Sequence, residues 1–281
     1  MIEYPEFISI GHVTYDIYPE KKLIGGSAIY SSLTAHNLGL STGIITSRGP
    51  DFSYDGLLSG INMVSTLSDH TTTFCNSYHQ GKRKQVINQI ANKIKIDQIP
   101  EHWNKAKIIH ICTIANEIDE AIFDFFQDNL VGLTPQGLMR KWDKKGQVYP
   151  KCWIPNNNIL SKVDVLIFSE EDISDFPEVL EKYVSSIKIV IVTRGSKGSV
   201  LYWQGQKIVF PVFKVKEVDP TGAGDVFAAA FLIKYHKTGD PIESSRFANC
   251  VASFAVEEKG TAGISNFDRL IKRASLMGID L

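Results

Sequence analysis

One segment of the sequence combines glycine, threonine and aspartate in an order suited to phosphate chemistry. The segment 218–231 (VDPTGAGDVFAAAF) joins a polar glycine turn directly to an apolar, helix-forming run. The first backbone N–H groups of a helix have no partner within it, and the helix dipole favours negative charge there. The N–H groups of Gly222, Ala223 and Gly224 can therefore converge on an anion, because no bulky side chain keeps a phosphate away from the backbone.

Asp225 follows in the expected first turn, beside this anion-binding turn. A carboxylate repels phosphate, so its position suggests a general base that takes a proton from an attacking hydroxyl group as a phosphoryl group arrives. An ordinary helix with an acidic first turn and no function would contain the same residues. The string is neither a Walker loop, which needs G-K-[ST], nor the Rossmann pattern G-x-G-x-x-G.

The elements that must position this turn are predicted by the pattern of apolar residues. Short β-branched runs predict strands at 7–13, 43–46, 108–114, 129–133, 163–168 and 187–193, and a hairpin is predicted over 199–203 and 207–210. Helical spacing predicts helices at 27–38, capped by Ser27 and ended by Gly39, and at 117–126, 222–236, 241–257 and 266–276. Near-continuous apolar strands alternating with helices predict a three-layer α/β core around a buried, mainly parallel sheet.

The segment 65–96 differs in composition from the rest of the chain. It is rich in Thr, Asn, Gln and Lys and poor in Leu, so its own core would be thin. We expect a small flap of strands beside the main sheet, with a turn near Gln80 and Gly81.

Composition and charge indicate a folded globular protein and argue against non-specific nucleic-acid binding and membrane insertion. The chain has 281 residues with 30 Lys+Arg and 31 Asp+Glu, and 43% of its residues are hydrophobic, which is typical of a folded globular protein. A net charge of −1 lacks the excess of positive charge that drives non-specific nucleic-acid binding. No apolar run is long enough to span a membrane, and the acidic N-terminus is unlike a signal peptide, so we expect a cytoplasmic protein without a membrane partner. The four cysteines are dispersed, with no C-x-x-C, and we expect buried reduced thiols.

The segment 219–225 (DPTGAGD) resembles the C-terminal signature of the ribokinase-like sugar kinases, the PfkB family. Other features resemble the family in the same order along almost the whole chain. They are Gly11 and Asp16, then Gly25 and Gly26 before a helix, then the flap at 65–96, then 192–198 (VTRGSKG), and finally the segment 249–263. Gln136, Gly137 and Arg140, with 168–172 (FSEED), resemble a branch that includes myo-inositol kinases and other small sugar or polyol kinases.

The resemblance implies a fold and an activity. It implies one ribokinase-like kinase domain over 1–281, with a small β-sheet lid formed by about 12–24 and 65–96. It also implies ATP-dependent phosphorylation of a hydroxyl group on a small sugar or polyol, with Asp225 as general base and Gly222, Ala223 and Gly224 as the anion hole.

The resemblance also suggests the residues that would bind substrate. Asp16 would accept hydrogen bonds from substrate hydroxyls, and Gly25 and Gly26 would let a polyol lie against the backbone. His12 lies beside this strand and is a further candidate for substrate binding.

The same resemblance implies which residues bind ATP, the phosphate donor. Thr193, Gly195, Gly198 and Asn249 would contact ATP, with Mg²⁺ arriving on the nucleotide, and Asp219 would belong to a monovalent-cation (K⁺) site. The family's Asn-x-x-Glu is replaced here by the segment 169–172 (SEED), which shortens both side chains and leaves Asp172 and Glu171 as the candidates near the metal.

Two alternatives remain open from the sequence. A nucleoside kinase would need a base pocket, which Phe74, Tyr78 and Tyr30 could supply. A non-catalytic protein that binds sugar or nucleotide for regulation is favoured only by the altered segment at 169–172. An exposed β flap is also a surface through which two copies of the chain could pair as a homodimer.

Overall fold

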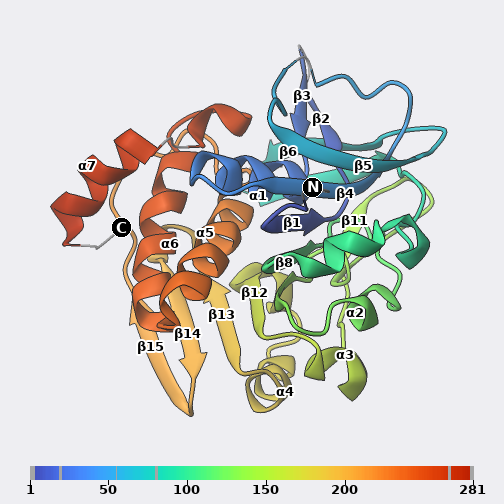
Figure 1. The fold of residues 1–281 in the computed structure, drawn as a ribbon. Helices are drawn as coiled ribbons and strands as arrows, with labels where there is room; N and C mark the ends of the chain where they lie inside the picture. Colours follow the sequence, from blue (N-terminus) through green and yellow to red (C-terminus); the bar gives the residue numbers. More distant parts are fainter. Residues whose placement is uncertain (1–3, 19–20, 55, 80–81, 265–266, 279–281) are drawn as a thin grey trace.

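The computed structural model describes residues 4–18, 21–54, 56–79, 82–264 and 267–278. Within these residues the chain forms a nine-stranded sheet, a separate four-stranded sheet and a two-stranded hairpin (Figure 1). The fold is the predicted α/β arrangement of a mainly parallel sheet between two layers of helices, with a small second sheet. No helix in this part of the chain is long and apolar enough to cross a membrane.

The large sheet has the strand order β15-β14-β13-β12-β9-β8-β1-β4-β5. Its strands are β1 (Phe7–Ile10), β4 (Thr42–Arg48), β5 (Ile61–Leu67), β8 (Ile108–Cys112), β9 (Leu130–Thr134), β12 (Val165–Ser169), β13 (Ile189–Thr193), β14 (Ser199–Trp203) and β15 (Gln206–Phe210). All neighbours pair in parallel except β13–β14 and β14–β15, which are antiparallel. Because the strands from β5 to β13 run in one direction, their carboxyl ends meet at one edge of the sheet.

Helices cover both faces of this sheet. Along β12, Ile167 packs with the helices on one face, whereas Leu166 packs with those on the other. The first layer contains α1 (Ser27–Asn37), α5 (Ala223–Thr238), α6 (Pro241–Ala255) and α7 (Phe267–Met277), and the second contains α2 (Ile122–Phe125), α3 (Asn157–Ser161) and α4 (Val179–Ser186). Phe231 of α5 is fully buried, and burying a side chain of this size contributes about 1.5–3 kcal/mol.

The four-stranded sheet, here called the lid sheet, has the order β3-β2-β6-β7. It consists of β2 (Thr14–Tyr18), β3 (Lys21–Gly25), β6 (Thr72–His79) and β7 (Lys82–Gln89). The hairpin of β10 (Arg140–Trp142) and β11 (Val148–Pro150) lies against β7, where the Ile87 N–H donates to the Gly146 carbonyl at 2.9 Å. The expected turn at Gln80 and Gly81 lies outside the described residues.

Three predicted elements differ from the structure. Residues 61–67 form β5, an edge strand of the large sheet, so the segment 65–96 contains more than the lid sheet. The helix expected over 117–126 is reduced to α2, because the buried Glu117 carboxylate accepts hydrogen bonds from the N–H groups of Ile114 and Ala115 and so holds a turn. Gly26, not Ser27, is the N-cap of α1, and its φ of 97° is one that side-chain-bearing residues rarely adopt.

Candidate active site

The glycine turn that the sequence predicts to bind an anion, here called the anion-binding turn, lies at the N-terminus of α5. Gly222 is the N-cap with φ of 79°, and Asp225 lies in the first turn of the helix. A Cβ atom on Gly222 would lie 2.3 Å from the Tyr30 ring, so only glycine fits there. A Cβ atom on Gly224 would have no neighbour within 4 Å, so this glycine leaves the backbone open on its outer side.

The amides of this turn are not all available to a ligand. The Ala223 N–H donates to the Pro220 carbonyl at 3.2 Å. No backbone hydrogen bond is found for the Gly222 and Gly224 amides in the part of the chain that the structure describes. The turn can therefore offer these two N–H groups to an anion, whereas Ala223 already has an acceptor.

Asp219 fixes the turn to the rest of the molecule. Its Oδ1 accepts from the Thr221 N–H at 3.0 Å, and its Oδ2 accepts from the Gly260 N–H at 3.2 Å. Each carboxylate oxygen therefore holds one backbone amide of the neighbouring turns. Among the described residues, no group of three or more His, Cys, Asp or Glu is arranged to hold a metal ion.

Asp16 faces the site from the lid sheet and belongs to a chain of polar side chains. It is 7% exposed, and its Oδ1 accepts from Asn76 Nδ2 at 3.1 Å. Asn76 Oδ1 in turn accepts from Gln85 Nε2 at 2.9 Å. Sequence analysis missed Asn76 and Gln85. The alternation of β6 and β7 could have placed them on one face, but not beside Asp16, because that requires the pairing of β2 with β6.

The two glycines at the end of β3 are required by close contacts. A Cβ atom on Gly25 would lie 2.5 Å from Asp16 Oδ2. On Gly26 it would lie 2.5 Å from the His12 carbonyl oxygen, at a positive φ. Both glycines therefore let the start of α1 approach the strand that carries Asp16.

The residues from the lid sheet and from α5 meet at one place. Burial raises the pKa of Tyr30, and the charges of Asp16, Asp219 and Asp225 raise it further. Burial likewise raises the pKa of Cys112 at the end of β8, with the charge of Asp225 adding to the effect. Asp16 and Asp225 are therefore both near the carboxyl edge of the large sheet, with Tyr30 close to each.

His12 has a different environment from the one expected. Its ring is fully buried, Nδ1 pairs with Thr72 Oγ1 at 2.8 Å, and Nε2 pairs with the Asn92 carbonyl at 2.9 Å. The carbonyl can only accept, so Nε2 carries the proton and Nδ1 accepts from Thr72. Burial lowers the pKa of His12. Because both ring nitrogens are used inside the protein, we leave His12 out of the substrate site.

The expected nucleotide loop follows β13. Thr193 ends the strand, and its Oγ1 donates to the Phe168 carbonyl at 3.3 Å. Gly195 and Gly198 have φ of 52° and 88°, and a Cβ atom on Gly198 would lie 2.0 Å from the Phe210 carbonyl oxygen. This loop is thus a tight glycine turn at the same edge of the sheet as Asp16.

Asn249, expected on the nucleotide side, is mostly buried in α6. Its side chain is 5% exposed, and Nδ2 donates to Ser199 Oγ at 2.9 Å and to the Ser245 carbonyl at 3.0 Å. The amide nitrogen therefore joins α6 to β14.

The segment expected near the metal forms a short 3₁₀ turn. Asp172 Oδ2 accepts from the Ser169 N–H at 2.9 Å, and Ser169 Oγ accepts from the Glu171 N–H at 3.2 Å. Glu171 is exposed. Asp172 therefore closes a capping box, which explains how this segment is ordered with shorter side chains than Asn and Glu.

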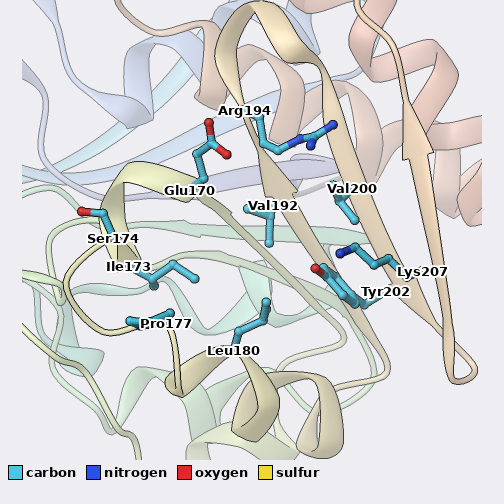
Figure 2. Close-up of a pocket in the computed structure, with 10 residues that line it drawn as sticks. All are labelled: Glu170, Ile173, Ser174, Pro177, Leu180, Val192, Arg194, Val200, Tyr202 and Lys207. Carbon is cyan, nitrogen blue, oxygen red and sulfur yellow. The ribbon is translucent and has the colours of Figure 1, made fainter.

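A pocket of about 300 Å³ lies beside this 3₁₀ turn, on the face of the sheet that α4 covers (Figure 2). Val192 and Tyr202 line it from β13 and β14, and Leu180 lines it from α4. Glu170 and Arg194 lie at one end, where Glu170 also pairs with Lys197 at 3.0 Å. Asp225 lies in the opposite helical layer, so this pocket is separate from the anion-binding turn.

Comparisons with known proteins agree with this arrangement. Residues 20–266 match the family model described as pfkB family carbohydrate kinase. A cytidine kinase of Thermococcus kodakarensis is 28% identical over 258 residues, covering 85% of this chain and 91% of the relative. A nucleoside kinase of Methanocaldococcus jannaschii is 26% identical over 269 residues, covering 90% of this chain and 86% of the relative.

Solved structures show the same fold. A pyrophosphate-dependent kinase in the ribokinase family, complexed with a pyrophosphate analog and myo-inositol, superposes with a TM-score of 0.79 at 20% identity, covering 90% of this chain and 96% of the other. The Methanocaldococcus jannaschii nucleoside kinase superposes with a TM-score of 0.74 at 24% identity, covering 96% and 98%. The family match spans well over half of the chain. The chain therefore belongs to the pfkB family of carbohydrate kinases and is a phosphotransferase that acts on a hydroxyl group.

Proposed function

We propose that this protein transfers the γ-phosphoryl group of ATP to a hydroxyl group of a small sugar or polyol. The observation that carries this proposal is the position of Asp225, in the first turn of α5 and one residue after the open backbone of Gly224. A base and an anion-binding turn are thereby held side by side on a rigid helix. That is the arrangement a hydroxyl needs when it attacks a phosphoryl group.

In the proposed reaction Asp225 accepts the proton of the acceptor hydroxyl. The Gly222 and Gly224 N–H groups, with the α5 dipole, stabilise the negative charge of the phosphoryl group during transfer. Asp219 keeps this turn in place through its bonds to Thr221 and Gly260. The turn is therefore organised before the substrates arrive, and little reorganisation accompanies the reaction.

We further propose that the lid sheet holds the acceptor. Asp16 would accept hydrogen bonds from acceptor hydroxyls, and Asn76 and Gln85 would orient Asp16 and extend the polar surface. Gly25 and Gly26 would allow the acceptor to lie against the backbone.

The donor would bind along the loop after β13, against Thr193, Gly195 and Gly198. Ribokinases have been solved with ATP and, in one case, with ATP and Mg²⁺, and this supports ATP as the donor here. The chain shows no cluster of acidic side chains for the metal among its described residues, and Asp172 is engaged in its capping box. We therefore assign Mg²⁺ to the phosphate oxygens and water rather than to a protein site.

A nucleoside is the second candidate acceptor. Its support comes from three relatives that match along most of their length, a cytidine kinase and two nucleoside kinases. A matching ribokinase, by contrast, aligns over only 37% of this chain. Phe74 is 4% exposed and packs with Ile87 and Ile114, so it is not available as an open wall for a base.

The experiment is a coupled assay of ADP release with Mg-ATP against sugars, inositols and nucleosides, with a parallel assay for pyrophosphate as donor. We expect turnover on one acceptor class. Asp225→Asn should lower kcat by about 10²–10⁴-fold while ATP binding, measured by calorimetry, stays within threefold. Asp128→Asn, an exposed carboxylate before β9, is the matched control and should keep full activity. Turnover of Asp225→Asn within threefold of the unmodified enzyme would refute the role of Asp225.

A further inference from the structure

The pocket of about 300 Å³ beside the 3₁₀ turn has no part in the proposed reaction, and the pairing of three strands explains one of its walls. Val192 of β13 lies opposite Val200 of β14. Tyr202, two residues further along β14, lies opposite Lys207 of β15, so these side chains share one face of the sheet. Arg194 follows two residues after Val192 and also lines the pocket. One sheet face therefore combines an apolar surface with two positive side chains.

The facing wall is apolar and comes from the segment that enters α4. Figure 2 shows Pro177 and Leu180 across the pocket from Arg194 and Lys207. Between the two walls, Val192 is 6% exposed and Ile173 is 8% exposed, so both are part of the buried core. The volume is at the small end of the range for ligand pockets, and it suits a molecule with an apolar body about the size of one ring.

The two positive side chains of the pocket have no acidic partner. Neither Arg194 nor Lys207 forms an ion pair with a carboxylate in the part of the chain that the structure describes. Glu170 also lines the pocket, but its carboxylate pairs with Lys197 at 3.0 Å. The charges of the pocket that remain without compensation are therefore positive, and they favour a ligand with a carboxylate or phosphate group.

Arg194 also has a donor that the protein does not satisfy. Its Nη2 donates to the Lys197 carbonyl at 3.2 Å, whereas its Nε is buried and has no hydrogen-bond partner among the described residues. A buried donor without an acceptor costs free energy, and an acceptor on a ligand would recover that cost. Guanidinium groups bind carboxylates and phosphates through adjacent N–H groups, so the unpaired Nε points to an anionic ligand.

The same arginine belongs to the loop that we propose binds the donor. It lies between Thr193 and Gly195, and its backbone N–H donates to the Gly198 carbonyl at 2.7 Å. Its side chain holds the Lys197 carbonyl of the same turn. A ligand that pairs with Arg194 would therefore stabilise this loop in the conformation proposed to bind ATP.

We propose that this pocket is an effector site for a small organic anion with an apolar body about the size of one ring, and that its occupation strengthens donor binding. The anionic group pairs with Arg194 and Lys207, and the apolar body lies between Val192 and Leu180. The binding site goes beyond the proposed function, whereas its effect on donor binding rests on that function.

The first test is isothermal titration calorimetry of the protein with benzoate and with phenyl phosphate. Benzyl alcohol keeps the ring without the charge, and acetate keeps the charge without the ring. We expect at least one of the two anionic ring compounds to bind with a Kd of about 1 mM or below, and both controls to bind at least tenfold more weakly. Equal affinity for benzyl alcohol, or no binding of either anionic ring compound, would overturn the proposal.

Two lysine variants locate the bound probe. Lys207→Gln removes one positive charge of the pocket and should weaken the tighter anionic probe about fivefold or more, while kcat and both KM values without the probe stay within twofold. Lys188→Gln, at an exposed position before the other end of β13, is the matched control and should bind the probe as the unmodified protein does. Unchanged binding by Lys207→Gln would overturn the proposal, because the probe would then lie elsewhere.

The second test repeats the titration with the donor site filled by Mg²⁺ and adenylyl imidodiphosphate, an ATP analogue that is not hydrolysed at its terminal phosphate. We expect the Kd of the probe to fall about fivefold, and by linkage the Kd of the analogue to fall by the same factor when the probe is saturating. Displacement of the probe by the analogue would place the probe in the donor site and overturn the proposal. An unchanged Kd would overturn the effector role.

Failure of the proposed function gives a different result. In that case the enzyme is inactive on the whole acceptor panel, or the analogue does not bind. The comparison of the unmodified protein with Lys207→Gln still decides whether the pocket binds the anionic probe, because that titration needs neither ATP nor turnover. The two failures are therefore distinguishable.

Discussion

Two glycines of the anion-binding turn are glycine for different physical reasons. Gly222 has a positive φ, and its Cα faces the Tyr30 ring, whereas Gly224 has an ordinary helical conformation with open space beside it. Packing and backbone strain therefore require glycine at 222. Neither requires glycine at 224, where under the proposed function the reason for glycine would be the approach of a phosphate to the backbone.

This difference predicts opposite results for two alanine substitutions. Gly222→Ala should lower the free energy of unfolding by about 2–4 kcal/mol, because it combines strain at positive φ with overpacking against Tyr30. Gly224→Ala should leave stability within about 1 kcal/mol and yet lower kcat/KM for the donor at least tenfold. Urea unfolding and steady-state kinetics on both variants provide the measurements. Full activity of Gly224→Ala would show that no phosphate lies against that residue.

At the level of single residues, the sequence predicted that the glycine turn and Asp225 lie at the start of one helix, because they are contiguous in the chain. It also placed Asp16, Gly25 and Gly26 in one segment. It could not show that Asn76 and Gln85 orient Asp16, because their contact depends on the register between three strands. It could not establish that His12 Nε2 and Asn249 Nδ2 donate hydrogen bonds inside the protein. Their acceptors come from segments distant in sequence, which only the tertiary structure brings together.

At the level of elements, α7 buries Leu270 and Ala274 in the core, and one arginine gives it polar contacts with α6. Arg273 is 15% exposed in its side chain, donates to Ser253 Oγ at 2.8 Å and to Glu257 Oε2 at 2.7 Å, and lies 3.6 Å from the centre of the Phe254 ring. Its guanidinium also lies 5.3 Å from the centre of the Phe213 ring, in the segment that leads to Asp219. The arginine thus connects α7, α6 and the chain that enters the anion-binding turn.

We expect Arg273→Ala to lower the free energy of unfolding by about 2–3 kcal/mol, because it leaves a half-buried Glu257 without its partner and removes the stacking on Phe254. Lys272→Ala, at an exposed position of the same helix, should change it by less than about 0.5 kcal/mol. Urea unfolding of the two variants makes the comparison. Equal stability of both would show that α7 contributes nothing through Arg273.

The elements that sequence predicted well share one property. The central strands are short apolar runs buried on both faces, so local composition alone identifies them. The edge strand Ile61–Leu67 was missed because most of its residues are only partly buried and three of the seven are polar. The helix over 117–126 was overpredicted because its apolar spacing is genuine, but the Glu117 carboxylate binds the backbone amides of the preceding turn.

At the level of the whole molecule, two fully buried histidines make stability depend on pH. Burial lowers the pKa of His110 to about 3 and lowers that of His12 as well, from an ordinary value of 6.5. Below pH 6.5 the unfolded chain binds protons that the folded protein does not, so stability falls as pH decreases towards the folded-state pKa values. His110 alone should remove about 2 kcal/mol between pH 7 and pH 5.

The measurement is urea unfolding of the protein at pH 7, 6 and 5. His110→Gln should reduce the loss of stability between pH 7 and pH 5 by about 2 kcal/mol. His236→Gln, at an exposed position, should leave the pH dependence unchanged. A pH dependence of His110→Gln identical to that of the unmodified protein would contradict neutral burial of His110.

The hydrogen bonds of His12 have a consequence for how the molecule can evolve. Its ring joins Thr72, where the chain enters β6, to Asn92, just after it leaves β7, while His12 itself lies where the chain first enters the lid sheet. Thr72 Oγ1 also accepts from the Ala91 N–H at 2.9 Å. His12 thus joins three places where the chain enters or leaves the lid sheet: before β2, at the start of β6 and after β7. These three crossings are remote from Asp225 in sequence. Under the proposed function, exchanging the lid sheet at these crossings would change acceptor preference and leave the residues proposed for phosphoryl transfer in place.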